Sequence, residues 1–172
     1  MSATDPTPEQ GCMPAQPTDE HAWLRHMVGE WTIESECLGG PGMPPFKSTG
    51  SETARMLGDL WLVADGRGEM PDGAVGFWRL ALGFDPGRGK FVGSWVGSMM
   101  SSMFVYEGLL APDGRALPLM TEGPSFAGDG TTAPYRDSYE RVSDDERVLR
   151  SSSLGPDGQW TEFMIARYRR VR

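Results

Sequence analysis

Apolar and polar residues alternate over many short stretches of this chain, and turn residues separate the stretches at regular intervals. Residues 31–37, for example, read Trp-Thr-Ile-Glu-Ser-Glu-Cys. A period of two is typical of an antiparallel strand with one buried face and one face in water. Pro-Asp-Gly occurs at 71–73, 112–114 and 156–158. Each copy suits a tight turn, because Pro presets one backbone angle and Gly accepts a positive φ.

This pattern predicts an all-β fold of roughly ten strands, arranged as a barrel or a sandwich. Only one short helix is expected before the strands, which disfavours α/β architectures. The predicted strands cover residues 31–38, 47–57, 60–64, 76–84, 90–95, 104–110, 116–121, 135–142, 147–154 and 160–170.

The segment before the strands divides into a tail and a helix. Residues 1–17 are rich in Pro and Thr and bury too little apolar surface to order themselves, so we expect a disordered tail. Residues 19–28 have helical spacing, and Gly29 is a suitable helix stop. The apolar face of this helix consists of Trp23, Leu24, Met27 and Val28. We therefore expect one domain over residues 18–172, a size that can enclose a core.

The charge balance excludes some classes of partner. Lys and Arg number 16 against 24 Asp and Glu, which gives a net charge of −8. Nucleic acids and anionic membranes both require clustered cations, so neither is an expected partner. Cys12 and Cys37 make no disulfide framework, and the start of the chain lacks the apolar run of a secretory signal. We expect a reduced, cytoplasmic protein.

Several short motifs, in this order, resemble a known bacterial family. They are Gly29-Glu30-Trp31, Gly58-Asp59-Leu60-Trp61-Leu62, Leu82-Gly83-Phe84-Asp85, Phe91-Val92-Gly93-Ser94-Trp95 and Tyr168-Arg169-Arg170. On these motifs the chain is similar to the domain-of-unknown-function 1579 family, over about residues 20–171. That family has a lipocalin-like (calycin-like) fold and no established activity. Phe84 departs from the family, which usually has Tyr at this position.

The resemblance implies a single closed antiparallel barrel that encloses one small ligand. In lipocalin-like barrels the Trp of the Gly-x-Trp motif plugs the floor behind a lid-like helix, which gives Trp31 a structural role. The same pattern implies that Arg170 stacks on Trp31 as a cation on an aromatic face.

Metal, cofactor and nucleophilic chemistry find little support in the sequence. Haem iron commonly takes an axial His, but His21 and His26 lie five residues apart in the predicted helix, away from strands that would line a cavity. No paired Cys or His spacing suits zinc. The serines of residues 97–103 have no adjacent base. We predict no metal, no cofactor and no catalytic residue.

The leading hypothesis is that the barrel binds a small apolar or amphipathic molecule. Arg136 is a candidate anchor for an anionic group, and Glu162 is a candidate inward-facing carboxylate because it shares strand parity with Met164. The expected cavity walls are Trp78, Trp95, Tyr106 and Met164. One alternative is a non-enzymatic structural or interaction protein with a filled barrel that acts as a homodimer. A second is a small isomerase-like or hydrolase-like enzyme that uses a cavity carboxylate.

Overall fold

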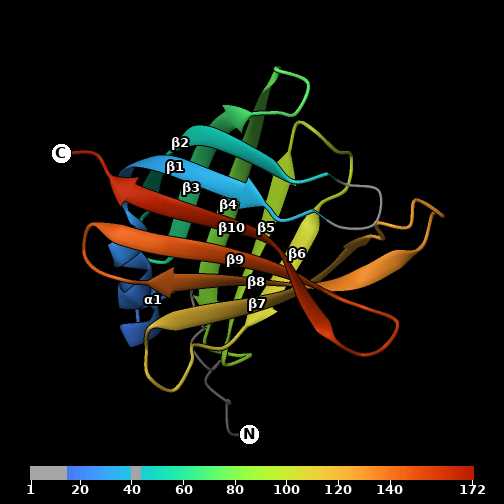
Figure 1. The fold of residues 1–172 in the computed structure, drawn as a ribbon. Helices are drawn as coiled ribbons and strands as arrows, with labels where there is room; N and C mark the ends of the chain where they lie inside the picture. The colour runs from blue at the N-terminus through green and yellow to red at the C-terminus, as the bar shows by residue number, and fades with distance from the viewer. Residues whose placement is uncertain (1–14, 40–43) are drawn as a thin grey trace, which may run out of the picture.

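The computed structural model describes residues 15–39 and 44–172. Within these residues ten antiparallel strands form a closed barrel, in which each strand pairs with the next and β10 pairs with β1 (Figure 1). The predicted all-β barrel is confirmed, whereas most of the predicted tail, residues 1–14, lies outside the described residues. The strands are β1 (Gly29–Cys37), β2 (Phe46–Leu57), β3 (Trp61–Glu69), β4 (Val75–Asp85), β5 (Lys90–Gly97), β6 (Phe104–Gly108), β7 (Ala116–Pro124), β8 (Thr132–Arg141), β9 (Glu146–Leu154) and β10 (Trp160–Arg170).

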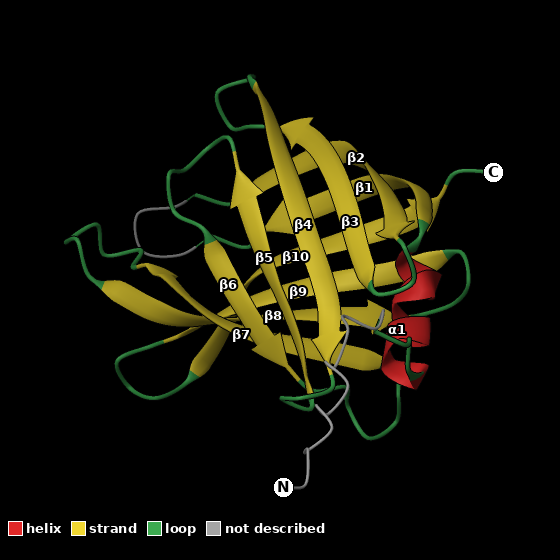
Figure 2. Cartoon of the chain, turned by 180° about the vertical axis from the view of Figure 1, so that it is seen from behind, coloured by secondary structure: helices red, strands yellow, loops and turns green. Residues whose placement is uncertain are grey.

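A short helical segment covers one end of the barrel (Figure 2). It consists of α1 (Asp19–Leu24) and a 3-10 turn, η1 (Arg25–Met27). Leu24 and Met27 are fully buried and belong to the hydrophobic core, so this segment seals the end of the barrel with its apolar face.

Trp31 and Arg170 join the helical segment to the first and last strands. The Trp31 indole Nε1 donates a hydrogen bond to the Met27 carbonyl oxygen at 2.9 Å. The Arg170 guanidinium lies 4.3 Å from the Trp31 ring centroid and donates to the carbonyl oxygens of His26 and Val28. The α-helix ends at Leu24, earlier than its spacing predicts, and Arg170 satisfies two of the carbonyl groups that follow it before the chain enters β1.

Strand β3 extends to Glu69, well beyond the predicted end at Ala64. The additional residues include Asp, Arg and two Gly, which have low strand propensity on their own. Gly66 nevertheless has a specific role, because a Cβ at this position would overlap the indole of Trp78 on the neighbouring strand β4. Packing against β4 therefore determines that residues 65–69 are a strand, despite their low local strand propensity.

Gly29 combines a positive φ with the close approach of another side chain. Its φ is +136°, and a Cβ there would overlap the Arg170 guanidinium. We expect Gly29→Ala to lower the free energy of unfolding by roughly 2 kcal/mol or more, because it adds backbone strain to a steric overlap.

Urea denaturation of Gly29→Ala and of Gly58→Ala tests this expectation. Gly58 also has a positive φ, +62°, but a Cβ there would meet open space. Its substitution should therefore lose only about 1 kcal/mol. Equal losses in the two variants would contradict the proposed overlap with Arg170.

Candidate functional site

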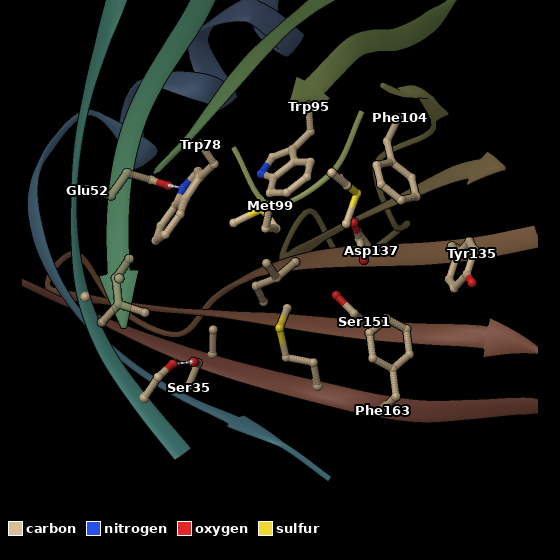
Figure 3. A pocket seen from close by; sticks show the side chains of 18 of the residues that line it. Ser35, Glu52, Trp78, Trp95, Met99, Phe104, Tyr135, Asp137, Ser151 and Phe163 are labelled. Carbon is tan, nitrogen blue, oxygen red and sulfur yellow. Dashed lines mark hydrogen bonds between the residues drawn. The ribbon is translucent and has the colours of Figure 1, made fainter. Parts of the chain in front are cut away.

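A cavity of about 530 Å³ occupies the barrel, from Ile33 and Tyr168 near Trp31 to the exposed Met99 and Met100 at the open end, the barrel mouth. Most of its lining is apolar or aromatic, with a few hydroxyl and carboxyl groups (Figure 3). Cavities of this size and character are typical small-molecule sites.

Five aromatic side chains form a collar around the outer part of the cavity. Neighbouring rings meet edge-to-face, with centroids 5.0 to 6.0 Å apart. Met99 and Met100 line the same region and are exposed at the barrel mouth. The members of this aromatic collar are Trp95, Phe104, Phe126, Tyr135 and Phe163. The collar therefore surrounds the cavity on the side of the barrel mouth.

Asp137 on β8 presents a carboxyl group to the middle of the cavity (Figure 3). The Tyr106 hydroxyl donates a hydrogen bond to Asp137 Oδ2 at 2.5 Å, and Ser151 lies directly opposite on β9. Burial raises the pKa of the Asp137 carboxyl, and hydrogen bonding from the Ser151 and Tyr106 hydroxyls partly opposes that rise. Burial also raises the pKa of the Tyr106 hydroxyl, which keeps it a neutral donor.

A buried ion pair closes the inner end of the cavity. Glu52 on β2 forms an ion pair with Arg147 on β9. It also accepts a hydrogen bond from Trp78 Nε1 at 3.0 Å (Figure 3). The Arg147 guanidinium lies between two rings, 4.7 Å from the Trp31 centroid and 4.1 Å from the Tyr168 centroid. Two of its nitrogens, Nε and Nη1, have no hydrogen-bond partner among the described residues. The aromatic faces therefore provide much of the stabilisation of this cation.

The structure places four of the predicted binding residues on the cavity wall. They come from four different strands and are Trp78, Trp95, Tyr106 and Met164. Trp31 and Arg170, predicted at the floor, lie together beneath the helical segment.

Arg136 lies on the outer face of the barrel. Its neighbours Tyr135 and Asp137 both line the cavity, so alternation directs Arg136 away from it. The Arg136 guanidinium lies 4.8 Å from the ring centroid of Trp160, which provides it with a surface cation–π contact. The structure therefore does not bring Arg136 to the cavity.

Glu162 also lies away from the cavity, and a β-bulge explains why. The register of β10 against β9 shifts between Glu162 and Met164. An extra residue at a bulge changes the face on which later side chains lie. Met164 therefore lines the cavity, while Glu162 forms an ion pair with Arg150 at 3.2 Å. Glu162 and Met164 are two residues apart and would share a face in a regular strand, but the bulge places them on different faces.

Two charged groups inside the barrel, Asp137 and Arg147, are not among the site residues predicted from the sequence. Asp137 could have been found from the period of two, since it lies between Tyr135 and Tyr139 on the same face of β8. Arg147 carries no such signal, because a buried Arg becomes recognisable only when Glu52, Trp31 and Tyr168 surround it.

Both histidines belong to the helical segment, and neither lines the cavity. His21 is 2% exposed. Its Nδ1 accepts a hydrogen bond from the Thr18 backbone N–H at 3.0 Å. His26 Nδ1 donates to the Trp23 carbonyl oxygen. In the described part of the chain, no three His, Cys, Asp or Glu side chains gather to hold a metal ion.

Residues 16–170 match the model of a family described as Protein of unknown function (DUF1579). The chain belongs to this family. None of the curated proteins matches it. Within residues 15–39 and 44–172 no helix has the length and apolar character needed to cross a membrane.

Two solved structures share the fold of this family member. The structure of Rv2717c from M. tuberculosis has a TM-score of 0.66 at 16% identity, covering 91% of this chain and 100% of that chain. The S-type phycobiliprotein lyase CPES from Guillardia theta has a TM-score of 0.55 at 12% identity, covering 91% and 99% respectively. At these identities the likeness shows a common barrel fold.

The buried ion pair at the floor should be costly to break. We expect Glu52→Gln to lower the free energy of unfolding by about 3–5 kcal/mol, because Arg147 would remain charged, buried and without its counterion. Adding Arg147→Met should recover much of that loss. Denaturant titration of both variants checks this, with Asp65→Asn as a control at an exposed pair. That control should cost no more than about 1 kcal/mol, and a similar cost for Glu52→Gln would contradict the expectation.

His26 should make the fold sensitive to acid. Burial lowers the pKa of His26 from 6.5 to about 4, so the unfolded state binds more protons between these values and stability falls as the pH falls. From pH 7 to pH 5 this corresponds to a loss of about 2 kcal/mol from His26 alone. Urea denaturation at both pH values should show a smaller loss for His26→Gln than for the wild type. Equal losses would rule out His26 as the sensitive group.

Proposed function

We propose that this barrel binds one small apolar or amphipathic molecule in its cavity. The observation that carries the proposal is an interior volume of about 530 Å³, lined mainly by aromatic and apolar side chains and reachable at the barrel mouth. Water inside the cavity makes few hydrogen bonds with such walls. A ligand that displaces this water removes the apolar surface of the walls and of the ligand from water, which favours binding.

The wall residues suit a planar, partly apolar guest. Trp78 and Trp95 offer large ring surfaces, while Met164 provides a soft thioether that adapts to different shapes. The Tyr106 and Asp137 pair adds a polar position that can orient the guest. These residues lie on separate strands, so the rigid barrel holds them in place around the cavity.

The cavity weighs against the filled-barrel alternative, which requires an interior packed with side chains. The enzymatic alternative requires a carboxylate that faces the cavity, and Asp137 meets this geometric condition without indicating a reaction. Binding is therefore the function that the geometry supports best.

A neutral fluorescent dye, N-phenyl-1-naphthylamine, tests the proposal directly. Its emission rises in an apolar environment, so titration of the wild-type protein should give saturable enhancement at one dye per barrel. Ser35→Phe would add a ring to the inner wall (Figure 3) and should weaken dye binding by about tenfold or more.

Glu34→Phe is the matched control, because Glu34 lies one residue away on the same strand and faces solvent. Its dye affinity should equal that of the wild type, and circular dichroism should show that both variants keep the barrel. If the dye does not bind, or if both variants bind it equally well, the proposal is wrong.

A further inference from the structure

The charged side chains that line the cavity are all acidic. They are Glu52, Glu69 and Asp137, and among the described residues no Lys, Arg or His lines the cavity. Segments 1–14 and 40–43, which lie outside the described residues, contain no Lys, Arg or His. The electrostatic character of the cavity is therefore negative, in a chain whose net charge is also −8.

Asp137 differs from the other two acidic residues because it is neither paired with a cation nor exposed at the mouth. Glu52 is neutralised by Arg147, and Glu69 is exposed near the mouth. Asp137 forms no ion pair with any described residue. Its protein partners are the hydroxyl groups of Tyr106 and Ser151, which are neutral.

A carboxylate in an apolar cavity without a counterion is incompletely stabilised. Two hydroxyl donors offset part of the desolvation cost, but they supply no positive charge. The other titratable groups close to Asp137 are Tyr106, Tyr139 and Tyr168, and burial raises the pKa of each of these hydroxyls. They therefore stay neutral, and Arg147 is already engaged by Glu52. A cationic group on the ligand is the missing partner.

The aromatic collar favours the same kind of ligand. The faces of Trp95, Phe104 and Tyr135 carry negative electrostatic potential and attract cations within about 6 Å of a ring centre. A cation that enters at the mouth would pass these rings before it reaches Asp137. An anion would meet repulsion from both the rings and the carboxylates.

We infer that the ligand of this barrel is a small organic cation with an aromatic body, held by a salt bridge between its protonated nitrogen and the Asp137 carboxylate. The inference rests on the proposed binding function and specifies its ligand class. It also excludes the anionic ligands, such as fatty acids, that an inward-facing Arg136 would have selected.

Three naphthalene compounds of similar size and shape but different charge test how ligand charge affects binding. They are 2-naphthylmethylamine, which is cationic at pH 7.5, the neutral 2-naphthylmethanol and the anionic 2-naphthoate. Each is titrated against the complex of wild-type protein with N-phenyl-1-naphthylamine, and displacement of the dye is measured. The amine should displace the dye at about one-tenth of the alcohol concentration, and the carboxylate should be the weakest competitor.

Substitution of Asp137 tests the anchor itself. Asp137→Asn keeps an oxygen that can accept the Tyr106 hydrogen bond but removes the charge. It should weaken binding of the amine about tenfold more than it weakens binding of the alcohol. Glu140→Gln is the matched control, because Glu140 lies on the same strand, faces outward and pairs with Arg150. Amine affinity in this control should equal that of the wild type.

The outcomes distinguish the ligand class from the binding function. If the dye binds and Ser35→Phe blocks it, but the amine shows no advantage over the alcohol, the cationic class is wrong and the binding function stands. The same conclusion follows if Asp137→Asn and Glu140→Gln affect the amine equally. If the dye does not bind the wild type, the binding function itself fails. The ranking of the three compounds uses wild-type protein, so it remains decisive even if Asp137→Asn does not fold.

Discussion

The buried Arg147 is the group on which the organisation of this barrel most depends. A guanidinium at the bottom of a barrel is tolerable only with a counterion and polarisable neighbours. Glu52 supplies the negative charge, and the rings of Trp31 and Tyr168 supply aromatic faces for cation–π contacts. Trp31 is in turn fixed by the helical segment and by Arg170. The floor is thereby complete without help from the upper part of the barrel, which leaves that part free to enclose a cavity.

Glycines in the strands explain why so many large side chains leave the barrel hollow. Trp78 lies across Gly66 on β3, and Phe104 lies across Gly123 on β7, at distances that no Cβ could accept. A large ring that lies flat along the wall occupies the space of its neighbour's missing side chain rather than the barrel centre. Trp78 also donates a hydrogen bond to Glu52, two strands away. The indole can reach Glu52 because Gly66, which lies between them on β3, has no side chain.

The period of two and the turn chemistry predicted an all-β barrel or sandwich with approximately these strands, and the family resemblance added the closed barrel. Four of the residues expected on the wall line the cavity. The errors of the prediction arose where that period is interrupted or where partners are distant. The bulge near Met164 separated Glu162 from its expected face. The predicted end of β3 was too early. Gly66 is held in the strand by packing against the Trp78 indole of β4, and this contact between strands is not visible in the local sequence. The Glu52–Arg147 pair joins residues far apart in the chain, so local spacing could not reveal it.

Strand register links the fold to the chemistry of the cavity. On β8, Tyr135, Asp137 and Tyr139 face inward, while the intervening Arg136 faces outward. A shift of one residue in this strand would exchange a carboxylate for a guanidinium inside the barrel and reverse the charge that the cavity presents. The pairing of Asp137 with Ser151 on β9 and its hydrogen bond from Tyr106 on β6 both oppose such a shift. The contacts that fix the register are therefore the same contacts that place the Asp137 carboxyl group inside the cavity.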